Sequence, residues 1–346
     1  MVSTFYASGP LRQGLESTGV PVISLEKHSR WDVFGFFFRL IWLLRRSRPA
    51  VLHAYLSTAN VLGVVVKPFV PPMKIVWGLR ASNVDLSQYG FLHKLQFWIE
   101  CRLSRFVDLI IVNSMAGRDY AASRGFPSGK MVVIHNGIDV ERFHPDSVAR
   151  DRIRKAWKVT PQEMLIGLIG RLDPMKGHAH FLHAAALLVH DRYDVRFVCV
   201  GNGSQMYRDS LQALCKGLEI DKRVMWFESS YQISEIYNAL DIATSSSIFG
   251  EGFPNVVAEA MACSVPCVVT DIGDSGWVVG GTGEVVERKN PSELAKGWTR
   301  LLDRLVREPD LGARARARIV EHFQHDRLVE RTSAVLAELL RDSRSS

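Results

Sequence analysis

The sequence predicts an α/β fold in which two doubly wound halves face each other across a cleft. Its 346 residues exceed the size at which one hydrophobic core usually stops growing, so two domains are expected. From Val2 onward, short runs of β-forming residues alternate with helical stretches, which is typical of parallel sheets joined by crossover helices. Ligands of such folds bind at the carboxyl ends of the strands, so the loops that follow strands are where a site is expected.

In the first half, six runs are expected to be strands, and two stretches are the clearest helices. The second of these helices carries apolar positions mixed with charges, as a partly buried helix does. The expected strands are Val2–Tyr6, Val20–Leu25, Ala50–Ala54, Lys74–Gly78, Leu109–Val112 and Met131–Ile134, and the helices are Asp32–Arg46 and Gly90–Phe106.

A second series begins after a polar segment, His144–Asp151, which predicts a linker. Its expected strands are Leu165–Ile169, Val195–Val200, Val224–Phe227, Ile242–Ser245 and Pro266–Thr270, and its clearest helices are His178–His190 and Gln205–Leu218. The predicted domains are therefore residues 1–143 and 144–322. Residues 323–346 are expected to form a C-terminal helix, for which a crossing back to the first domain is considered.

The net charge of +7 is concentrated in the first half. Residues 1–145 hold 17 Lys and Arg against 9 Asp and Glu, a difference of +8, and the remaining residues hold 26 against 27, a difference of −1. A basic half is compatible with nucleic acid, an anionic membrane surface or an anionic small substrate. No zinc-finger, RRM or helix-turn-helix signature accompanies the cluster Arg45, Arg46 and Arg48, so nucleic acid is not expected as a partner.

Cysteine usage and the chain start favour a cytoplasmic protein. The cysteines form no CxxC pair and no zinc spacing, so buried thiols in a reducing cytosol are the preferred interpretation. They are Cys101, Cys199, Cys215, Cys263 and Cys267. The first residues, MVSTFYASG, lack the basic and apolar regions of a signal peptide. The longest apolar run, Val33–Leu44, contains Arg39 and is too short to span a bilayer.

Two glutamates eight positions apart mark the stretch FGEGFPNVVAEAMA, residues 249–262. Glu251 lies in a turn-forming patch after an expected strand, and Glu259 lies in a run that predicts a helix. A strand, a glycine-rich turn and a helix point backbone N–H groups and a positive dipole end at an anion, so a phosphate fits there. Flanking carboxylates then accept hydrogen bonds from the vicinal hydroxyls of a sugar. The alternative is that Glu251 is a solvated loop residue and Glu259 an exposed helix residue.

Two more strand ends carry candidate ligand-binding loops. GRLDPMKG, residues 170–177, offers Arg171 and Lys176 near a helix start, where two cations neutralise a diphosphate. GNGS, residues 201–204, follows a neighbouring strand, and its glycines let the backbone approach a ligand closely. A plain turn is the alternative interpretation of GNGS.

These motifs, followed by VPCVVTDIGDSGWVVGGTG (residues 265–283), resemble the nucleotide-sugar half of glycosyltransferase family 4, the group 1 retaining enzymes of the GT-B fold. The stretch VNSMAGRDYAASRGFPSGKMVVIHNGIDVERF, residues 112–143, is similar to the family's segment leading to the hinge between domains. The resemblance covers nearly the whole chain, and the ordered set of motifs is specific.

The resemblance implies roles for individual residues. Arg171 and Lys176 are implied to bind the donor diphosphate, Glu259 the ribose, and Glu251 the hydroxyls of the donor sugar. The donor-binding set expected on this basis is Gly170, Arg171, Lys176, Gly201, Gly203, Glu251, Gly252, Phe253, Pro254, Asn255, Val256 and Glu259, with Glu251, Arg171 and Lys176 as catalytic residues. No DxD motif occurs, so neither a metal ion nor another cofactor is expected, and the two cations and the helix dipole stabilise the departing nucleoside diphosphate.

Three departures from the family pattern are visible. The family's first strand and glycine-rich loop, expected ahead of Met1, are missing from this sequence, and transfer is expected to need them. Many members carry a histidine after the fourth strand of the first domain, where this chain has GLRASN, residues 78–83, so Arg80 is considered for that space. Ser264 stands where a glycine is usual.

Other residues keep two interpretations each. His53, at the end of an expected strand, either lines the acceptor site with Arg80 or is a satisfied strand-end histidine. Asp274 either touches the donor sugar or caps a turn. The segment containing His135, Asn136 and Asp139 lies near the expected hinge, where structural turn roles are favoured.

An aromatic and basic segment raises the question of membrane contact. It consists of Trp31, Phe34, Phe36, Phe37, Phe38 and Trp42, with Arg39, Arg45, Arg46 and Arg48. These residues either face an anionic membrane as an amphipathic surface or pack against the first sheet. Peripheral contact with the inner face of the membrane is therefore an open alternative to a purely cytoplasmic location.

The expected function is retaining transfer of a hexosyl group from a UDP- or GDP-linked sugar to a glycan or lipid-linked acceptor, in polysaccharide or glycoconjugate biosynthesis. One alternative is a nucleotide-sugar epimerase or an NAD-dependent enzyme, although the G-x-G-x-x-G set that an NAD enzyme needs is not found. The other is a catalytically impaired nucleotide-sugar-binding protein.

Overall fold

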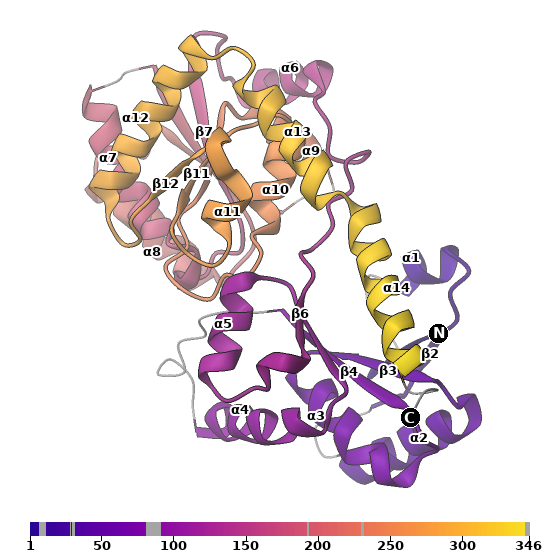
Figure 1. The fold of residues 1–346 in the computed structure, drawn as a ribbon. Helices are drawn as coiled ribbons and strands as arrows, with labels where there is room; N and C mark the ends of the chain where they lie inside the picture. The colour runs from indigo at the N-terminus through magenta and orange to yellow at the C-terminus, as the bar shows by residue number, and fades with distance from the viewer. Residues whose placement is uncertain are drawn as a thin grey trace.

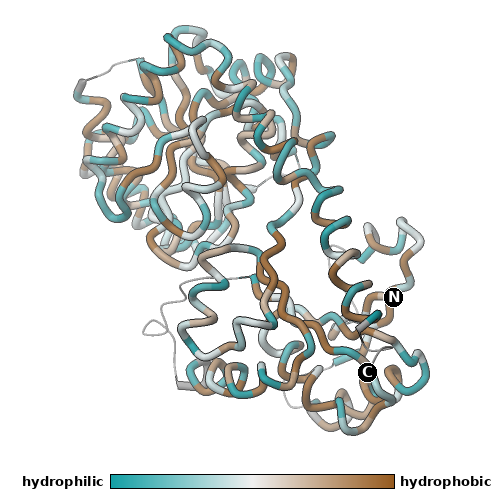
Figure 2. The backbone as a smooth tube through the Cα atoms, in the orientation of Figure 1, coloured by the Kyte–Doolittle hydropathy of each residue, from teal (hydrophilic) through white to brown (hydrophobic). Residues whose placement is uncertain are grey.

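Within the described residues, a six-stranded parallel sheet, a four-stranded parallel sheet and a separate parallel pair of strands organise the chain, which confirms the predicted α/β class (Figure 1). The structure is a computed structural model and describes residues 1–6, 12–27, 29, 32–80, 91–191, 194–229 and 232–342. Hydrophobic segments follow the strands inside each half, and hydrophilic segments lie mostly on the helices around them (Figure 2).

The second half contains a parallel sheet of six strands in the order β12-β11-β10-β7-β8-β9. Its strands are β7 (Met164–Ile169), β8 (Val195–Val200), β9 (Val224–Phe227), β10 (Ile242–Ser245), β11 (Cys267–Thr270) and β12 (Glu284–Val286). The order grows outward in both directions from β7 and β10, which are neighbours. This is the doubly wound arrangement, and its reversal point lies between these two strands.

Helices cover both faces of this sheet. They are α6 (Ser147–Ala156), α7 (His178–Asp191), α8 (Gln205–Gly217), α9 (Ile233–Ala239), α10 (Asn255–Ala262), α11 (Ser275–Val279), α12 (Pro291–Arg307) and α13 (Leu311–Phe323), with 3₁₀ turns at Pro174–Lys176 and Gly280–Thr282. Two hydrophobic cores result, one containing α10 and α13 and the other α7 and α12. In the second core, Trp298 of α12 packs edge-on against Phe181 of α7, with ring centroids 5.2 Å apart.

The first half has a four-stranded parallel sheet in the order β3-β4-β5-β6 and a separate parallel pair, β1-β2. The strands are β1 (Val2–Thr4), β2 (Val22–Ser24), β3 (Val51–Tyr55), β4 (Lys74–Leu79), β5 (Leu109–Val112) and β6 (Met131–Val133). The helices are α1 (Arg12–Ser17), α2 (Val33–Ser47), α3 (Ser57–Val66), α4 (Phe91–Leu103) and α5 (Met115–Ser123), with 3₁₀ turns at Lys67–Phe69, Ser104–Phe106 and Ser128–Lys130.

The chain passes between the halves twice, and the two passages are hydrogen-bonded to each other. The Ile138 N–H donates to the Phe323 carbonyl at 2.7 Å, and the His325 N–H donates to the Ile138 carbonyl at 2.9 Å. Beyond this point α14 (His325–Asp342) lies along the first half (Figure 1). Its side chains Leu328, Val335, Leu336 and Leu339 pack against the core of the first sheet.

Three local expectations need correction or comment. The segment predicted as a linker, His144–Asp151, enters α6 at Ser147, because the Asp146 carboxylate accepts a hydrogen bond from the Ala149 N–H and caps the helix. His53 lies in the middle of β3, which continues to Tyr55. Ser264 follows α10 with φ of 62°, a left-handed conformation that glycine adopts more readily. Residues 81–83 of the GLRASN stretch lie outside the described residues.

Candidate active site

The centre of the second sheet places the two predicted donor loops side by side. Strands β7 and β10 are neighbours, and the helices that follow them belong to cores on opposite faces of the sheet. Doubly wound sheets bind ligands in the crevice at such a reversal. The loop 170–177 follows β7 and the loop 246–254 follows β10, so both motifs lie at this crevice.

An ion pair joins the two loops. Lys176 Nζ contacts Glu251 Oε1, and Ser247 Oγ donates to the same carboxylate oxygen at 2.8 Å. Ser246 Oγ donates to the Lys176 carbonyl at 2.9 Å, which ties the first loop to the end of β10. Only 16% of the Lys176 side chain and 10% of the Glu251 side chain are exposed. Glu251 is therefore a buried, paired carboxylate, and the alternative of a solvated loop residue is wrong.

Arg171 belongs to the same loop as Lys176 but lies in a different environment. Its side chain is 71% exposed, and its Nη1 lies 3.9 Å from Asp173 Oδ2. An exposed pair at this distance contributes little to stability. The structure thus places Lys176 against Glu251 and leaves the Arg171 guanidinium largely exposed.

Glu259, on α10, is held by a tyrosine that the sequence did not single out. The Tyr237 hydroxyl donates to Glu259 Oε2 at 2.8 Å, and Tyr237 is itself buried in the core beneath α10. Burial raises the pKa of Glu259, although the Tyr237 hydrogen bond and the charge of Arg142 act in the opposite direction. Glu259 is therefore half-buried and oriented, which the alternative of an exposed helix residue did not foresee.

The start of α10 is packed against the first half of the chain. Phe253 and Pro254 are buried, and Val256 packs against the core under the helix. The Asn255 N–H donates to the Phe253 carbonyl at 3.1 Å, so one of the backbone donors expected here is used within the turn. The Asn255 side chain accepts a hydrogen bond from Asn136 Nδ2 at 2.9 Å, which joins the donor helix to the segment after β6.

The glycines of the other predicted loop have a packing reason to be glycines. A Cβ on Gly201 would lie 1.8 Å from the Gly170 carbonyl oxygen, and one on Gly203 would lie 2.4 Å from the Leu172 carbonyl oxygen. Any larger residue would push the end of β8 away from the end of β7. The close approach at GNGS is therefore between two loops of the protein, and contact of either glycine with a ligand stays a prediction.

The acceptor-side candidates His53 and Arg80 both contact the ring of Tyr55. The rings of His53 and Tyr55 are stacked with centroids 4.3 Å apart, and the Arg80 guanidinium lies over the Tyr55 ring at 5.1 Å. Arg80 also donates to Asn136 Oδ1, the residue that bonds to Asn255. Burial and, next, the charge of Arg80 lower the pKa of His53 to about 4, so this histidine is neutral at pH 7.

A cavity between the halves is lined by some of these predicted site residues. It has a volume of about 340 Å³ and is lined by Arg80 and Asn136 from the first half and by Asn255 and Glu259 of α10. The two chain passages form its remaining wall, with Ile138 and His325 among the lining residues. A predicted acceptor-side residue and two predicted donor-side residues therefore line one open pocket beside the passages between the halves.

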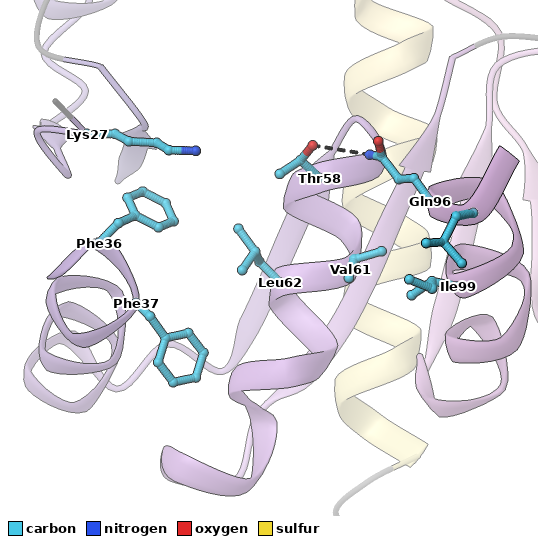
Figure 3. Close-up of a pocket in the computed structure, with 9 residues that line it drawn as sticks. Lys27, Phe36, Phe37, Thr58, Val61, Leu62, Gln96 and Ile99 are labelled. Carbon is cyan, nitrogen blue, oxygen red and sulfur yellow. Dashed lines mark hydrogen bonds between the residues drawn. The ribbon is translucent and has the colours of Figure 1, made fainter. Parts of the chain in front are cut away.

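Figure 3 shows a second cavity, whose volume is about 390 Å³. It is formed between α2, α3 and α4, and its polar groups are Lys27, Thr58 and Gln96, of which the last two are hydrogen-bonded at 3.2 Å. The rest of its lining is apolar: Phe36, Phe37, Val61, Leu62, Leu95 and Ile99. None of the donor-binding residues lines it.

Sequence reasoning left Asp274 and His135 open and missed Tyr237. Asp274 accepts hydrogen bonds from the Met115 and Ala116 N–H groups of α5, so it caps a helix of the other half of the chain. Its contact with the donor sugar stays a prediction. His135 Nε2 lies 3.0 Å from the same carboxylate. These contacts join residues more than a hundred positions apart, and no local pattern in the sequence signals them.

No group of three or more His, Cys, Asp or Glu side chains gathers in a way that could hold a metal ion within the part of the chain that the structure describes. In the same residues, no helix has both the length and the apolar character needed to cross a membrane.

Two family comparisons cover both halves of the chain. The family described as "Glycosyltransferase Family 4" matches residues 2–142, and the family described as "Glycosyl transferases group 1" matches residues 163–304. The chain belongs to the glycosyltransferases of family 4, group 1, which confirms the resemblance given above.

Individual relatives agree with this assignment. The D-inositol 3-phosphate glycosyltransferase of Rhodococcus opacus is 28% identical over 228 residues, which are 63% of this chain and 50% of that protein. An Escherichia coli protein named UDP-Gal:alpha-D-GlcNAc-diphosphoundecaprenol alpha-1,3-galactosyltransferase is 22% identical over 240 residues, 68% of this chain and 62% of that one. The chain spans about half the length of the first curated relatives that it matches.

Solved structures show the GT-B fold. Alr3699/HepE of Anabaena, in complex with UDP, superposes with a TM-score of 0.86 over 97% of this chain and 91% of that chain, at 20% sequence identity. Its complex with UDP-glucose gives a TM-score of 0.85. At this level of identity the likeness concerns the fold alone.

Proposed function

We propose that this protein transfers a hexosyl group, with retention of configuration and without a metal ion, from a nucleoside diphosphate sugar to a glycan or lipid-linked acceptor. The observation that carries the proposal is the Lys176–Glu251 ion pair at the reversal point of the second sheet, next to the start of α10. A cation and an oriented carboxylate at this crevice suit a ligand with both phosphate and hydroxyl groups.

The roles of the side chains follow from the charges that the reaction moves. The bond between the anomeric carbon and the diphosphate breaks, and the diphosphate leaves with the electron pair. A hydroxyl oxygen of the acceptor bonds to the anomeric carbon, and its proton is released with the nucleoside diphosphate. Lys176 and Arg171 stabilise the negative charge on the leaving group, a task that a divalent ion performs in other enzymes. Glu251 faces the sugar, near the positive charge that develops at the anomeric carbon, and Glu259 accepts hydrogen bonds from the ribose.

A uridine nucleotide is the donor that the relatives favour. The E. coli relative is named for UDP-Gal, and the Anabaena neighbour binds UDP and UDP-glucose. The diphosphoundecaprenol in the E. coli relative's name also supports a lipid-linked acceptor. We place the protein in the cytoplasm, where its five free cysteines stay reduced.

Peripheral contact with an anionic membrane is the second part of the proposal, and it rests on α2. Phe36 faces the core, whereas Phe34, Phe38 and Trp42, spaced four residues apart, form an exposed aromatic stripe. The Arg46 guanidinium lies over the Trp42 ring at 5.3 Å, so a cation accompanies the stripe. Exposed aromatics with adjacent cations suit the interface of an anionic lipid surface.

The test is a thermal-shift panel of UDP- and GDP-sugars followed by a transfer assay. A ligand at 100 times its dissociation constant adds about 2.7 kcal/mol to the free energy of unfolding. We expect a shift with a UDP-sugar that persists in EDTA, and loss of nucleotide affinity in Glu259→Gln. Binding without turnover would favour the impaired binding protein instead, and no shift with any sugar nucleotide would overturn the proposal.

A further inference from the structure

The carboxylate of Asp274 joins the two halves of the chain. It lies in the loop after β11, in the second half, and only 4% of the residue is exposed. Its Oδ2 accepts a hydrogen bond from the Met115 N–H at 2.7 Å, and its Oδ1 accepts one from the Ala116 N–H at 3.0 Å. These are the first two residues of α5, in the first half, so the carboxylate caps the positive end of a helix of the other half.

A third donor reaches the same carboxylate from the segment after β6. His135 Nε2 lies 3.0 Å from Asp274 Oδ2, and the His135 ring is set between Phe253 and Phe323, with centroids 5.7 Å and 5.5 Å away. Burial by itself raises the pKa of Asp274, but the hydrogen bonds from His135, Ala116 and Met115 outweigh it and lower the pKa. The carboxylate is therefore ionised and fully supplied with donors while the halves are together.

The backbone of the same loop is packed on the loop that carries Glu251. The Asp274 N–H donates to the Gly252 carbonyl at 3.0 Å. A Cβ on Gly273 would lie 2.5 Å from the carbonyl oxygens of both Glu251 and Gly252, so the two loops touch backbone to backbone. A shift of one loop has to shift the other.

The Glu251 loop also touches the first half directly. A Cβ on Gly252 would lie 2.9 Å from Asn113 Oδ1 and 3.2 Å from Ser114 Oγ. Asn113 directly follows β5, and Ser114 caps α5. The start of α5, Asp274 and the Glu251 loop therefore form one continuous set of contacts across the two halves.

We propose that Asp274 is a positioning residue for the transfer reaction. Its carboxylate binds the start of α5, and it thereby fixes the position of the Glu251 loop when the two halves close. This inference rests on the proposed function. An ionised carboxylate in so buried a position is favourable only where donors surround it, so Asp274 stabilises the closed arrangement and ties Glu251 to it. Opening the halves removes the two backbone donors of α5 from the carboxylate.

The test compares Asp274→Ala and Asp274→Asn with the wild type and with Asp271→Ala, which removes an exposed carboxylate from the same loop. Small-angle X-ray scattering measures the separation of the halves, calorimetry measures UDP affinity, and an assay with the UDP-sugar found by thermal shift measures kcat and KM. In Asp274→Ala we expect a larger radius of gyration and a kcat about a hundredfold lower. UDP affinity should change by less than about threefold, because the nucleotide contacts lie in the second half.

In Asp274→Asn, the radius of gyration and kcat should lie between those of the wild type and Asp274→Ala, because the amide oxygen still accepts one N–H. Asp271→Ala should behave as the wild type. A folded Asp274→Ala protein with wild-type scattering and kcat overturns the proposal, and so does a loss of UDP affinity as large as the loss of kcat. If Asp274→Ala lacks a cooperative thermal transition, Asp274→Asn is held to the same criteria. A wild type that transfers no sugar defeats the proposed function alone, and the scattering comparison then decides the role of Asp274.

Discussion

Lys176 and Glu251 contact each other as an ion pair, although each has a separate role in the proposed reaction. A diphosphate that binds Lys176 has to compete with the carboxylate that already contacts it. The pair therefore keeps the buried ammonium satisfied before the donor arrives. The contact also couples the two residues energetically, so a substitution of one changes the contribution of the other to ligand binding.

Substitution of Glu251 should separate nucleotide binding from transfer. In Glu251→Gln, Lys176 no longer leaves a carboxylate partner when the diphosphate binds, and one negative charge facing the phosphates is gone. We expect bare UDP to bind more tightly, by up to about tenfold, or about 1.4 kcal/mol, while kcat falls. Calorimetry and initial rates measure the two effects, with the exposed Glu287→Gln as the control. Weaker UDP binding in Glu251→Gln would contradict this competition.

His178 should make the protein sensitive to mild acid. It starts α7 and is fully buried, and burial, followed by the charge of Lys176, lowers its pKa to about 4. A histidine in the unfolded chain has a pKa of about 6.5. Between these values the unfolded state binds more protons, so the free energy of unfolding falls as the pH drops.

At pH 5 this difference amounts to roughly 2 kcal/mol. His178→Leu removes the titrating group, so the variant should lose about that much less stability than the wild type between pH 7 and pH 5. Urea unfolding at the two pH values measures the difference, and exposed His144→Gln is the control. Equal acid sensitivity of His178→Leu and the wild type would show that His178 is not the group responsible.

At the scale of single elements, α2 illustrates how one helix can serve two environments. Leu40, Leu43 and Leu44 are buried with Phe36 in the core of the first half, while the aromatic stripe of Phe34, Phe38 and Trp42 stays outside. The sequence offered packing and membrane contact as alternatives for these aromatics. The structure divides the aromatics between the two faces, so packing explains Phe36 and leaves the stripe without a packing role.

Removing the stripe should weaken binding to anionic vesicles. Phe38→Ser together with Trp42→Ser exposes no new core, because both side chains already lie outside. Burying an aromatic side chain of this size in a lipid interface contributes about 1.5–3 kcal/mol, so we expect a loss of at least tenfold in partitioning. Flotation with phosphatidylcholine vesicles, with and without phosphatidylglycerol, measures it. Trp98→Ser, at another exposed tryptophan, is the control, and an equal loss in that variant would argue against α2.

At the scale of the whole molecule, the sequence predicted the features that a local pattern of residues determines, which are the strands and the ligand-binding loops. The buried parallel strands read as apolar runs, so nearly all were placed within two or three residues, and the loops after β7 and β10 were identified from their glycines, cations and carboxylates. β12, Glu284–Val286, was missed because only two apolar residues stand there between a glycine-rich turn and a charged run. The contacts of Glu259 with Tyr237 and of Asp274 with α5 span 22 and 159 positions, and only the folded chain brings these residues together.

The paired passages between the halves have a consequence for modular assembly of the chain. Because Ile138 and His325 are already hydrogen-bonded, the stretch between them is an insertion whose two ends meet, and α14 completes the core of its host. Such an insertion can be excised or exchanged without opening a gap in the host. Residues 138–324, expressed alone, should therefore unfold in a single cooperative transition by calorimetry, and grafting another member's insertion at the same two positions should exchange donor preference while leaving the acceptor half intact.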